Sequence, residues 1–149
     1  MYRHILIASD GSALAGKGLD AGLALASALQ AKATLVTVSD PWQAVMAAEP
    51  SGLALGAELR EERRREQQVR AQAVIDDAQA RAARSGVELA ARYVAERLAD
   101  EAILETAESC GADLIVMASH GHRGLRRLLL GSQTQSVVSR GHLPVLVVR

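Results

Sequence analysis

Short apolar runs alternate with longer amphipathic stretches along this chain. The runs at residues 2–9 and 33–39 are rich in β-branched side chains and end in Ser or Asp turn residues, so they predict two strands. Residues 87–94 alternate between apolar and polar positions, which is the pattern of a half-buried strand. Residues 113–119 form a continuous apolar run typical of a central strand covered on both faces, and residues 143–148 predict a last strand.

Helical patterns fill the intervals between these strands. In the first helix, Ser12 can act as the N-cap, and Leu19, Leu23 and Ala26 recur on one face. Gly111 is the expected end of the third helix. The four predicted helices span residues 12–29, 58–85, 98–110 and 132–140.

The second predicted helix, residues 58–85, is dense in charge. Its run REERRRE is expected to remain in water as a solvated face. The rest of the segment consists of strong helix formers. The residues expected to share its apolar face are Leu59, Val69, Ala73 and Ala80.

Alternation of five strands with four helices predicts a doubly wound α/β fold, with a mostly parallel sheet and right-handed crossovers. With 149 residues and 49% hydrophobic composition, the chain is expected to form a single domain over residues 1–149. Residues 43–57 have little periodicity and are expected to form a flexible surface loop or lid. No apolar run is long enough to cross a bilayer, so we expect a cytoplasmic protein that does not enter membranes.

Charge is distributed unevenly, although the formal net charge is zero. Residues 114–149 contain five arginines and no acidic residue, whereas residues 1–113 contain 12 basic and 17 acidic side chains. The positive end favours an anionic ligand. Because aromatic residues make up 2% of the chain and Phe is absent, the stacking surfaces that single-stranded nucleic acids need are missing. A compact phosphate ligand is therefore expected, and nucleic acid is not.

The segment SHGHRGLRRLLLGSQTQ, residues 119–135, combines glycines, histidines and arginines. It begins at the carboxyl end of a predicted parallel strand, where open α/β sheets bind their ligands. Glycine lets backbone amides approach a ligand, and the start of the next helix adds N–H groups and a partial positive charge of roughly +0.5. The segment therefore predicts an anion-binding loop. The residues expected to shape it or to face the phosphate oxygens are His120, Gly121, His122, Arg123, Gly131 and Ser132.

Other chemistries have weaker support. His120 and His122 lack a third ligand nearby, so no metal site held by the protein is expected. Ser119 does not stand in a G-x-S-x-G motif, which leaves a hydrolase triad unsupported. The lysines of the chain are Lys17 and Lys32, and neither stands in a P-loop motif, so fast P-loop ATP hydrolysis is excluded.

Two polar residues have more than one interpretation. Asp10, in the sequence SDGS, can shape the turn before the first helix or face a ligand. Ser132 can cap the last helix, a role that is compatible with phosphate binding.

The spacing Ala118-x-x-Gly121-x9-Gly131-Ser132 resembles the G-x-x-G-x9-G-(S/T) nucleotide-binding signature of the universal stress protein family, in its ATP-binding branch. Three segments are similar to the family at compatible distances: HILIASDGS to its first strand and turn, DLIVMASHG to its fourth strand, and HLPVLVV to its last strand. The likeness covers nearly the whole chain. One residue departs from the signature, because Ala118 stands at its first glycine. The methyl group costs little if Ala118 has a negative φ, whereas a need for a positive φ or for backbone contact with the ligand would lower the affinity by an amount on the order of 1 kcal/mol.

The resemblance implies a Rossmann-like five-stranded sheet with the order 3-2-1-4-5. It implies that Asp10, with Ser9 beside it, contacts the adenosine part of ATP, and that the backbone near Val38 reads the adenine edge. It also implies a divalent cation such as Mg²⁺, held mainly by the phosphates, and a twofold dimer formed by pairing of the last strands. The residues that it places around the ribose and triphosphate are Ala118, Ser119, His120, Gly121, His122, Arg123, Gly131, Ser132, Gln133 and Thr134.

The expected function is that of an ATP-binding stress and regulatory protein with little or no catalysis. No general base, P-loop lysine or arginine finger is evident in the sequence. The expected ligand is an adenine nucleotide, and the expected assembly is a homodimer. Whether the protein also binds another protein is left open by the sequence. One alternative is an interaction module of the same fold that has lost nucleotide binding, with Ala118 as the first sign of that loss. The other is a slow ATPase in which His120 or His122 assists phosphoryl transfer.

Overall fold

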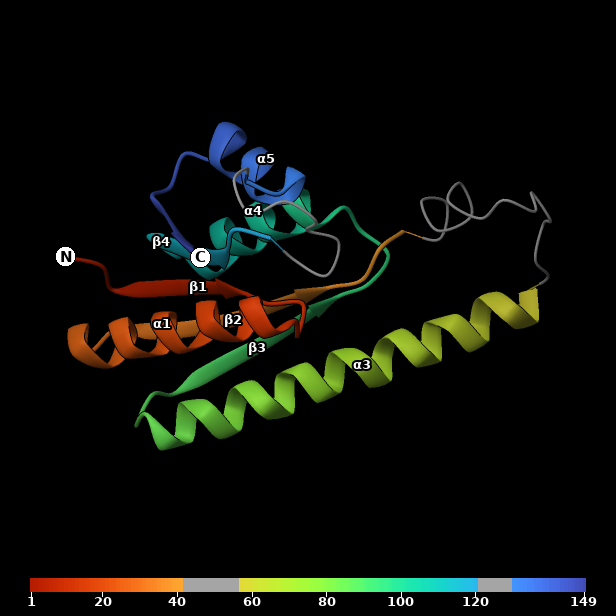
Figure 1. The fold of residues 1–149 in the computed structure, drawn as a ribbon, viewed down its shortest axis with the longest axis horizontal. Coiled ribbons are helices and arrows are strands. Elements are labelled where there is room, and N and C mark those ends of the chain that lie inside the picture. Colours follow the sequence, from red (N-terminus) through yellow and green to blue (C-terminus); the bar gives the residue numbers. More distant parts are fainter. Residues whose placement is uncertain (42–56, 121–129) are drawn as a thin grey trace.

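The computed structural model describes residues 1–41, 57–120 and 130–149. Within these residues the chain forms a five-stranded parallel sheet with the strand order β3-β2-β1-β4-β5 (Figure 1). The predicted α/β fold and the strand order implied by the resemblance are thereby confirmed. The strands are β1 (His4–Ala8), β2 (Lys32–Val38), β3 (Leu89–Val94), β4 (Leu114–Ala118) and β5 (Val145–Val148).

The helices of the described residues cover both faces of the sheet (Figure 1). α1 (Ala13–Leu29) and α3 (Ala57–Arg84) pack on one face and form one hydrophobic core with it. α4 (Ala99–Cys110) and α5 (Ser132–Arg140) pack on the other face and form the second core. This is the doubly wound arrangement that alternating strands and helices predict.

The two central strands are buried on both faces. In β1, Ile5, Leu6 and Ile7 have no exposed area, and every residue of β4 is buried. Side chains alternate in direction along a strand, so Ile5 and Ile7 pack toward α1 and α3 while Leu6 packs toward α4 and α5. The prediction of a doubly covered central strand at residues 113–119 is confirmed by β4.

The outer strands are less buried. The alternation expected for residues 87–94 is confirmed in β3, whose residues alternate between half-buried and exposed along its first part. β5 forms the other edge of the sheet, and Leu146 is 40% exposed there. The strand ends differ from the predicted ranges by one or two residues, because pairing with a neighbour, and not apolar pattern alone, defines where a strand ends.

α1 matches its prediction closely. Ser12 is its N-cap, and Ser12 Oγ accepts a hydrogen bond from Ala15 N at 3.2 Å. Leu19, Leu23 and Ala26 are 2%, 1% and 0% exposed, so the predicted apolar face is the buried one. The cap holds the start of α1 directly beyond the end of β1.

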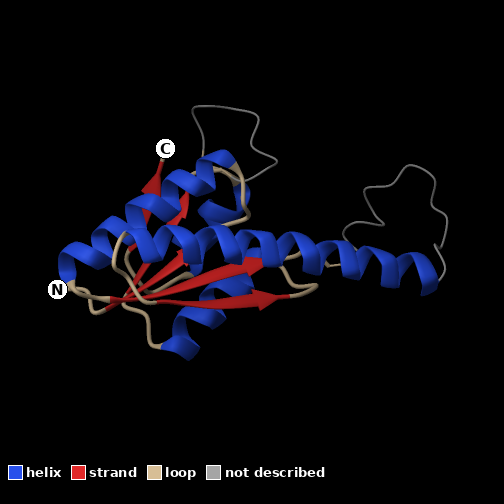
Figure 2. Cartoon of the chain, turned by 90° about the horizontal axis from the view of Figure 1, so that it is seen from below, coloured by secondary structure: helices blue, strands red, loops and turns tan. Residues whose placement is uncertain are grey.

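The buried face of α3 differs from the predicted face. α3 packs against β2 and β3 but extends well past the ends of these strands (Figure 2), so its first turns have no sheet to cover. Leu59 is 38% exposed for this reason, whereas Val69 is 69% exposed because it lies on the opposite side of the helix from the buried Ala71. Small side chains occupy the contact instead, which allows the long helix a close approach. Ala73 and Ala80 of the predicted face are exposed, and the buried residues of α3 are Ala71, Ala78 and Ala82.

The predicted loop at residues 43–57 lies outside the described residues, except that Ala57 begins α3. In the described parts of the chain, no helix combines the length and the apolar character needed to cross a membrane.

Candidate functional site

The carboxyl ends of β1, β2 and β4 open onto a cleft of about 410 Å³. β1 leads into α1 on one face of the sheet, whereas α5 follows β4 along the chain and packs on the other face. The chain therefore changes its winding direction between two neighbouring strands, and such a switch point leaves a crevice at the strand ends.

The turn after β1 forms part of the cleft floor. Asp10 Oδ1 accepts a hydrogen bond from Ser12 N at 3.0 Å, and Ser9 Oγ accepts one from Gly11 N at 3.3 Å. Gly11 has a φ of +79°, and a Cβ at this position would lie 2.6 Å from Val74 Cγ2. Both the backbone conformation and the space therefore favour glycine. Asp10 shapes this turn and also lines the cleft.

Backbone groups at the end of β2 point to the side of β1 but lie beyond the last residue of that strand, so β1 does not pair with them. Val36 O accepts a hydrogen bond from Ser9 N at 3.1 Å, whereas Ser39 N donates to Val94 O at 3.0 Å. Alternate residues of a parallel strand direct both backbone groups to the same neighbour. Val38 therefore directs its N–H and C=O to the side of β1, beyond the residue at which β1 turns away. Val38 lines the cleft, so this strand end offers a donor and an acceptor side by side.

Ser39 organises the rim between β3 and α4. Ser39 Oγ lies 2.9 Å from the Tyr93 hydroxyl and accepts a hydrogen bond from Glu96 N at 3.1 Å. Glu96 has a φ of 54°, a left-handed conformation that is uncommon for a residue with a side chain. Its carboxylate accepts a hydrogen bond from Arg64 Nε of α3 at 3.2 Å, and this bond and the charge of Arg64 hold the pKa of Glu96 below its usual value. The rim is thereby tied to α3.

The first turn of α5 forms the opposite wall. It carries no acidic residue, and its N-cap, Gly131, has no side chain that could cap the helix. Gly131 N donates to Ser119 O at 2.8 Å. A Cβ on Gly131 would lie 3.1 Å from that oxygen and 3.5 Å from His120 Cα, so the backbone here is closely packed. A helix start carries N–H groups without helical partners and a partial positive charge, which suits this turn to an anion.

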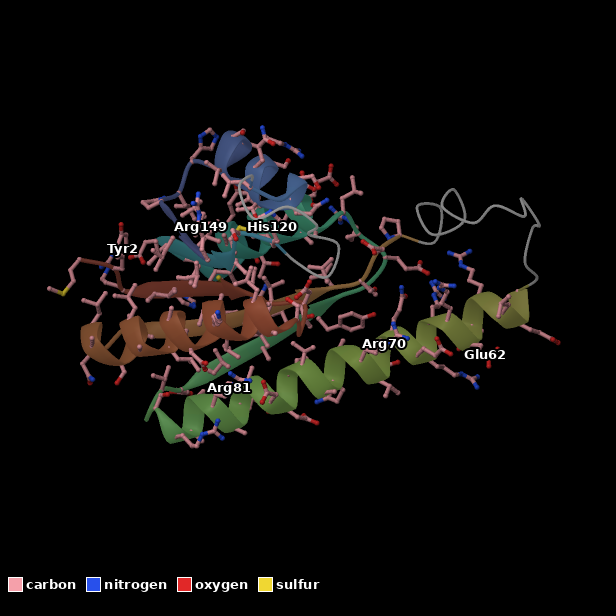
Figure 3. All side chains as sticks on the ribbon, viewed as in Figure 1. Tyr2, Glu62, Arg70, Arg81, His120 and Arg149 are labelled. Atoms are coloured by element: carbon pink, nitrogen blue, oxygen red, sulfur yellow. The ribbon has the colours of Figure 1, made fainter. Side chains whose placement is uncertain are left out.

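Buried polar side chains join α5 to the end of β4. Thr134 is 3% exposed, and its Oγ1 donates toward Ala118 O at 3.0 Å and Ser119 O at 3.2 Å. Ser119 N donates to Val148 O at 2.8 Å, and Ser119 Oγ lies 3.1 Å from His120 Nδ1. These contacts determine where α5 begins and orient His120, which lines the cleft (Figure 3).

A buried carboxylate anchors α5 to α4. Asp100 is 7% exposed and accepts hydrogen bonds from Ser136 Oγ and from Arg140 Nη1, the latter at 2.7 Å. Asp100 N donates to Gln133 Oε1 at 3.1 Å, so a residue of the cleft wall also caps α4. Burial raises the pKa of Asp100, but the hydrogen bonds from Ser136 and from Glu101 N together with the charge of Arg140 outweigh it, and the pKa lies below its usual value.

Many of the predicted site residues meet at this cleft, although they come from distant parts of the sequence. Those that line it are Asp10, Val38, His120, Gly131, Ser132, Gln133 and Thr134. Those that lie outside the described residues are Gly121, His122 and Arg123.

The remaining predicted residues lie behind the cleft surface. Ser9, Ala118 and Ser119 are 8%, 6% and 4% exposed, at the ends of β1 and β4. Ala118 belongs to β4 and has no positive φ. Its methyl group therefore causes no backbone strain.

Sequence reasoning missed the wall that α3 contributes. Gln67, Arg70, Ala71 and Val74 line the cleft, and their spacing places them on one face of the helix. In a segment so rich in charge, Arg70 looks like any other solvated arginine. The signal that could have found this wall is the small and apolar pair Ala71 and Val74 within that spacing.

Known proteins are similar to this chain over nearly its whole length. The model of the universal stress protein family matches residues 1–149. The universal stress protein YxiE of Bacillus subtilis (strain 168) is 33% identical over 150 residues, which cover 100% of each chain. The structure of protein MJ0577, from Methanocaldococcus jannaschii, has a TM-score of 0.78 at 26% identity and covers 99% of this chain and 96% of that chain. The universal stress protein from Archaeoglobus fulgidus, solved in complex with dAMP, shares the fold with a TM-score of 0.71 at 16% identity, covering 99% and 98% of the two chains.

Proposed function

Since this chain belongs to the universal stress protein family, we propose that it binds an adenine nucleotide, ATP in particular, in the cleft beyond β1, β2 and β4. Binding serves a regulatory role in the stress response, with little or no catalysis. The observation that carries the proposal is the first turn of α5, an acid-free helix start that lines the cleft beside a closely packed glycine.

The phosphates are assigned to the start of α5. Gly131 and Ser132 line the cleft at the end of the helix where N–H groups and partial positive charge accumulate. The hydroxyl of Thr134 is already engaged by two carbonyl oxygens, so Thr134 contributes through its backbone. Among the described residues, no group of three or more His, Cys, Asp or Glu side chains could hold a metal ion. A Mg²⁺ ion that accompanies ATP would be held mainly by the phosphate oxygens.

The nucleoside is assigned to the ends of β1 and β2. The N–H and C=O of Val38 match the acceptor and donor that adenine presents side by side on its edge, and hydrogen bonds to base edges are how proteins read unpaired bases. Asp10 follows β1, which lies between β2 and β4 in the sheet, so Asp10 stands between the end of β2 and the start of α5. Its carboxylate can accept hydrogen bonds from the ribose hydroxyls, because a carboxylate accepts several hydrogen bonds. The dAMP complex of the protein from Archaeoglobus fulgidus supports an adenine nucleotide as the ligand class.

We also propose a homodimer that pairs the β5 strands of two copies. β5 is an edge strand, and an edge presents backbone groups that can pair with another chain. Leu146 on this strand is 40% exposed, so a second copy would cover apolar surface as well.

Calorimetric titration of nucleotide-free protein with Mg-ATP tests the proposal, with Ser132→Glu as the diagnostic variant. A carboxylate in the first turn of α5 should stabilise the helix by about 0.3–1 kcal/mol, yet it should weaken ATP binding at least tenfold because it repels the phosphates. Ser139→Glu adds the same charge at the far end of α5 and should bind ATP as the native protein does. No heat and no thermal shift at millimolar Mg-ATP would refute the proposal, since a ligand that binds the native state must stabilise it.

A further inference from the structure

The α3 wall of the cleft contains a positive charge to which no part of the nucleotide has yet been assigned. Arg70 lines the cleft, and the ion pairs found between described residues do not include it. Four of the seven arginines of α3, in contrast, form ion pairs with carboxylates. The α3 arginines that pair with carboxylates are Arg60, Arg64, Arg65 and Arg81.

The position of Arg70 separates it from the phosphate end of the cleft. α3 packs against β2 and β3, whereas α5 follows β4 on the other face of the sheet. Figure 3 shows Arg70 on the α3 side, well apart from His120. Val74 contacts the turn at Gly11. Arg70 lies about one helical turn before Val74, toward the start of α3. Arg70 therefore borders the part of the cleft that Val38 lines.

The surface around Arg70 suits the flat face of a base. Ala71 and Val74 line the same wall with apolar atoms, and Tyr93 lines the cleft from β3. The guanidinium group is planar, delocalised and weakly hydrated, and it stacks on aromatic faces and on nucleic acid bases. Stacking uses the face of the base and leaves its edge to the backbone of Val38, so the two contacts are compatible.

We propose that Arg70 is a ligand contact of the nucleotide site and stacks its guanidinium on the adenine ring. This inference rests on the proposed function and adds a base-recognition residue from α3 to it. A base contact predicts that the contribution of Arg70 is the same for every adenine ligand, whatever its number of phosphates. A phosphate contact would instead become stronger from adenosine to AMP to ATP.

Titration of adenosine, AMP and Mg-ATP into the native protein and Arg70→Ala separates these outcomes. The variant should weaken all three ligands by the same factor, between about twofold and thirtyfold, which is the range for a cation on an aromatic face. Arg70→Lys keeps the charge but loses the planar group, so it should also bind all three ligands less tightly than the native protein. Arg84→Ala removes the same charge from α3 away from the cleft and should leave every affinity unchanged.

The same titrations distinguish failure of the Arg70 contact from failure of the proposed function. If the native protein binds the nucleotides and Arg70→Ala binds them equally well, the contact of Arg70 is wrong and the proposed function stands. If the loss appears with ATP and not with adenosine, the contact is with phosphate and stacking is wrong. If the native protein gives no heat with any of the three ligands, the proposed function itself fails. Circular dichroism of each variant verifies that it is folded.

Discussion

Replacing Gly22 by alanine should destabilise the fold, whereas the same replacement at Gly16, in the same helix, should stabilise it. A Cβ at Gly22 would lie 2.7 Å from Ile7 Cδ1 and 2.8 Å from Ile7 Cγ1. Ile7 has no exposed area and belongs to β1, the middle strand of the sheet, so its side chain is confined. At Gly16 the nearest atoms are the guanidinium nitrogens of Arg81, 3.6 Å and 3.7 Å away, which is ordinary contact with a flexible side chain.

Two contributions decide whether each variant has a higher or a lower free energy of unfolding than the native protein. Alanine in place of glycine inside a helix stabilises by about 0.5–1 kcal/mol, and this applies at both positions. At Gly22 overpacking adds a cost of about 1–3 kcal/mol. We therefore expect Gly16→Ala to raise the free energy of unfolding by about 0.5–1 kcal/mol, and Gly22→Ala to lower it by as much as about 2 kcal/mol. Because the helix contribution is common to both, the difference between the variants measures the overpacking cost.

Urea unfolding followed by far-ultraviolet circular dichroism measures both variants, provided that each keeps the native m value. The double variant Ile7→Val, Gly22→Ala removes the atom of the shorter contact. Ile7→Val alone should cost about 0.5–1.5 kcal/mol, and the double variant should be more stable than the sum of the two single effects by at least about 0.5 kcal/mol. Equal stability of Gly16→Ala and Gly22→Ala would show that overpacking against Ile7 does not govern this position. Simple additivity in the double variant would show that the contact with Ile7 Cδ1 contributes nothing and would leave only the contact with Cγ1.

Three further outcomes are expected. Because the pKa of Asp100 is lowered in the folded protein, the stability that Asp100 contributes is present at neutral pH and is lost as the pH falls below about 4. Urea unfolding should therefore show that Asp100→Asn loses less stability on acidification than the native protein does. Gly111 ends α4 with a φ of +69° and open space around it, so Gly111→Ala should cost about 1–2 kcal/mol through backbone strain alone, and an unchanged melting temperature would contradict this. Tyr93→Phe removes the hydrogen bond to Ser39 Oγ, which should cost about 1 kcal/mol and speed amide exchange at Glu96 N; native exchange there would show that the rim does not depend on this bond.

Parts of the candidate site could be predicted because their chemistry is local. Gly131 and Ser132 stand together at the start of a helix, and Asp10 stands in a turn directly after a strand. Each of these positions is recognisable from a few neighbouring residues, because turn and cap preferences act over such short distances. The parallel sheet then brings the two strand ends to the same edge.

Other parts of the site depend on partners that are distant in the sequence. Asp100 accepts a hydrogen bond from Arg140 and donates one through its N–H to Gln133, and Ser39 meets Tyr93 across two strands. No local pattern marks such pairs, since the distance between the partners is set by packing of whole elements. The capping role of Gln133 therefore could not be predicted from the sequence, in which the family resemblance places this residue around the ribose and triphosphate.

The sequence by itself determined the order of strands and helices, the doubly covered central strand β4 and the buried face of α1, because the spacing of apolar side chains encodes these features locally. Tertiary structure alone decided which face of α3 is buried and that Arg70 reaches the cleft. α3 is a charged helix that extends past the sheet (Figure 1), and its alanine face became the contact through close approach to β2 and β3. Where such a helix lies is a property of the assembled layers, and that position decides which of its charges lines the cleft.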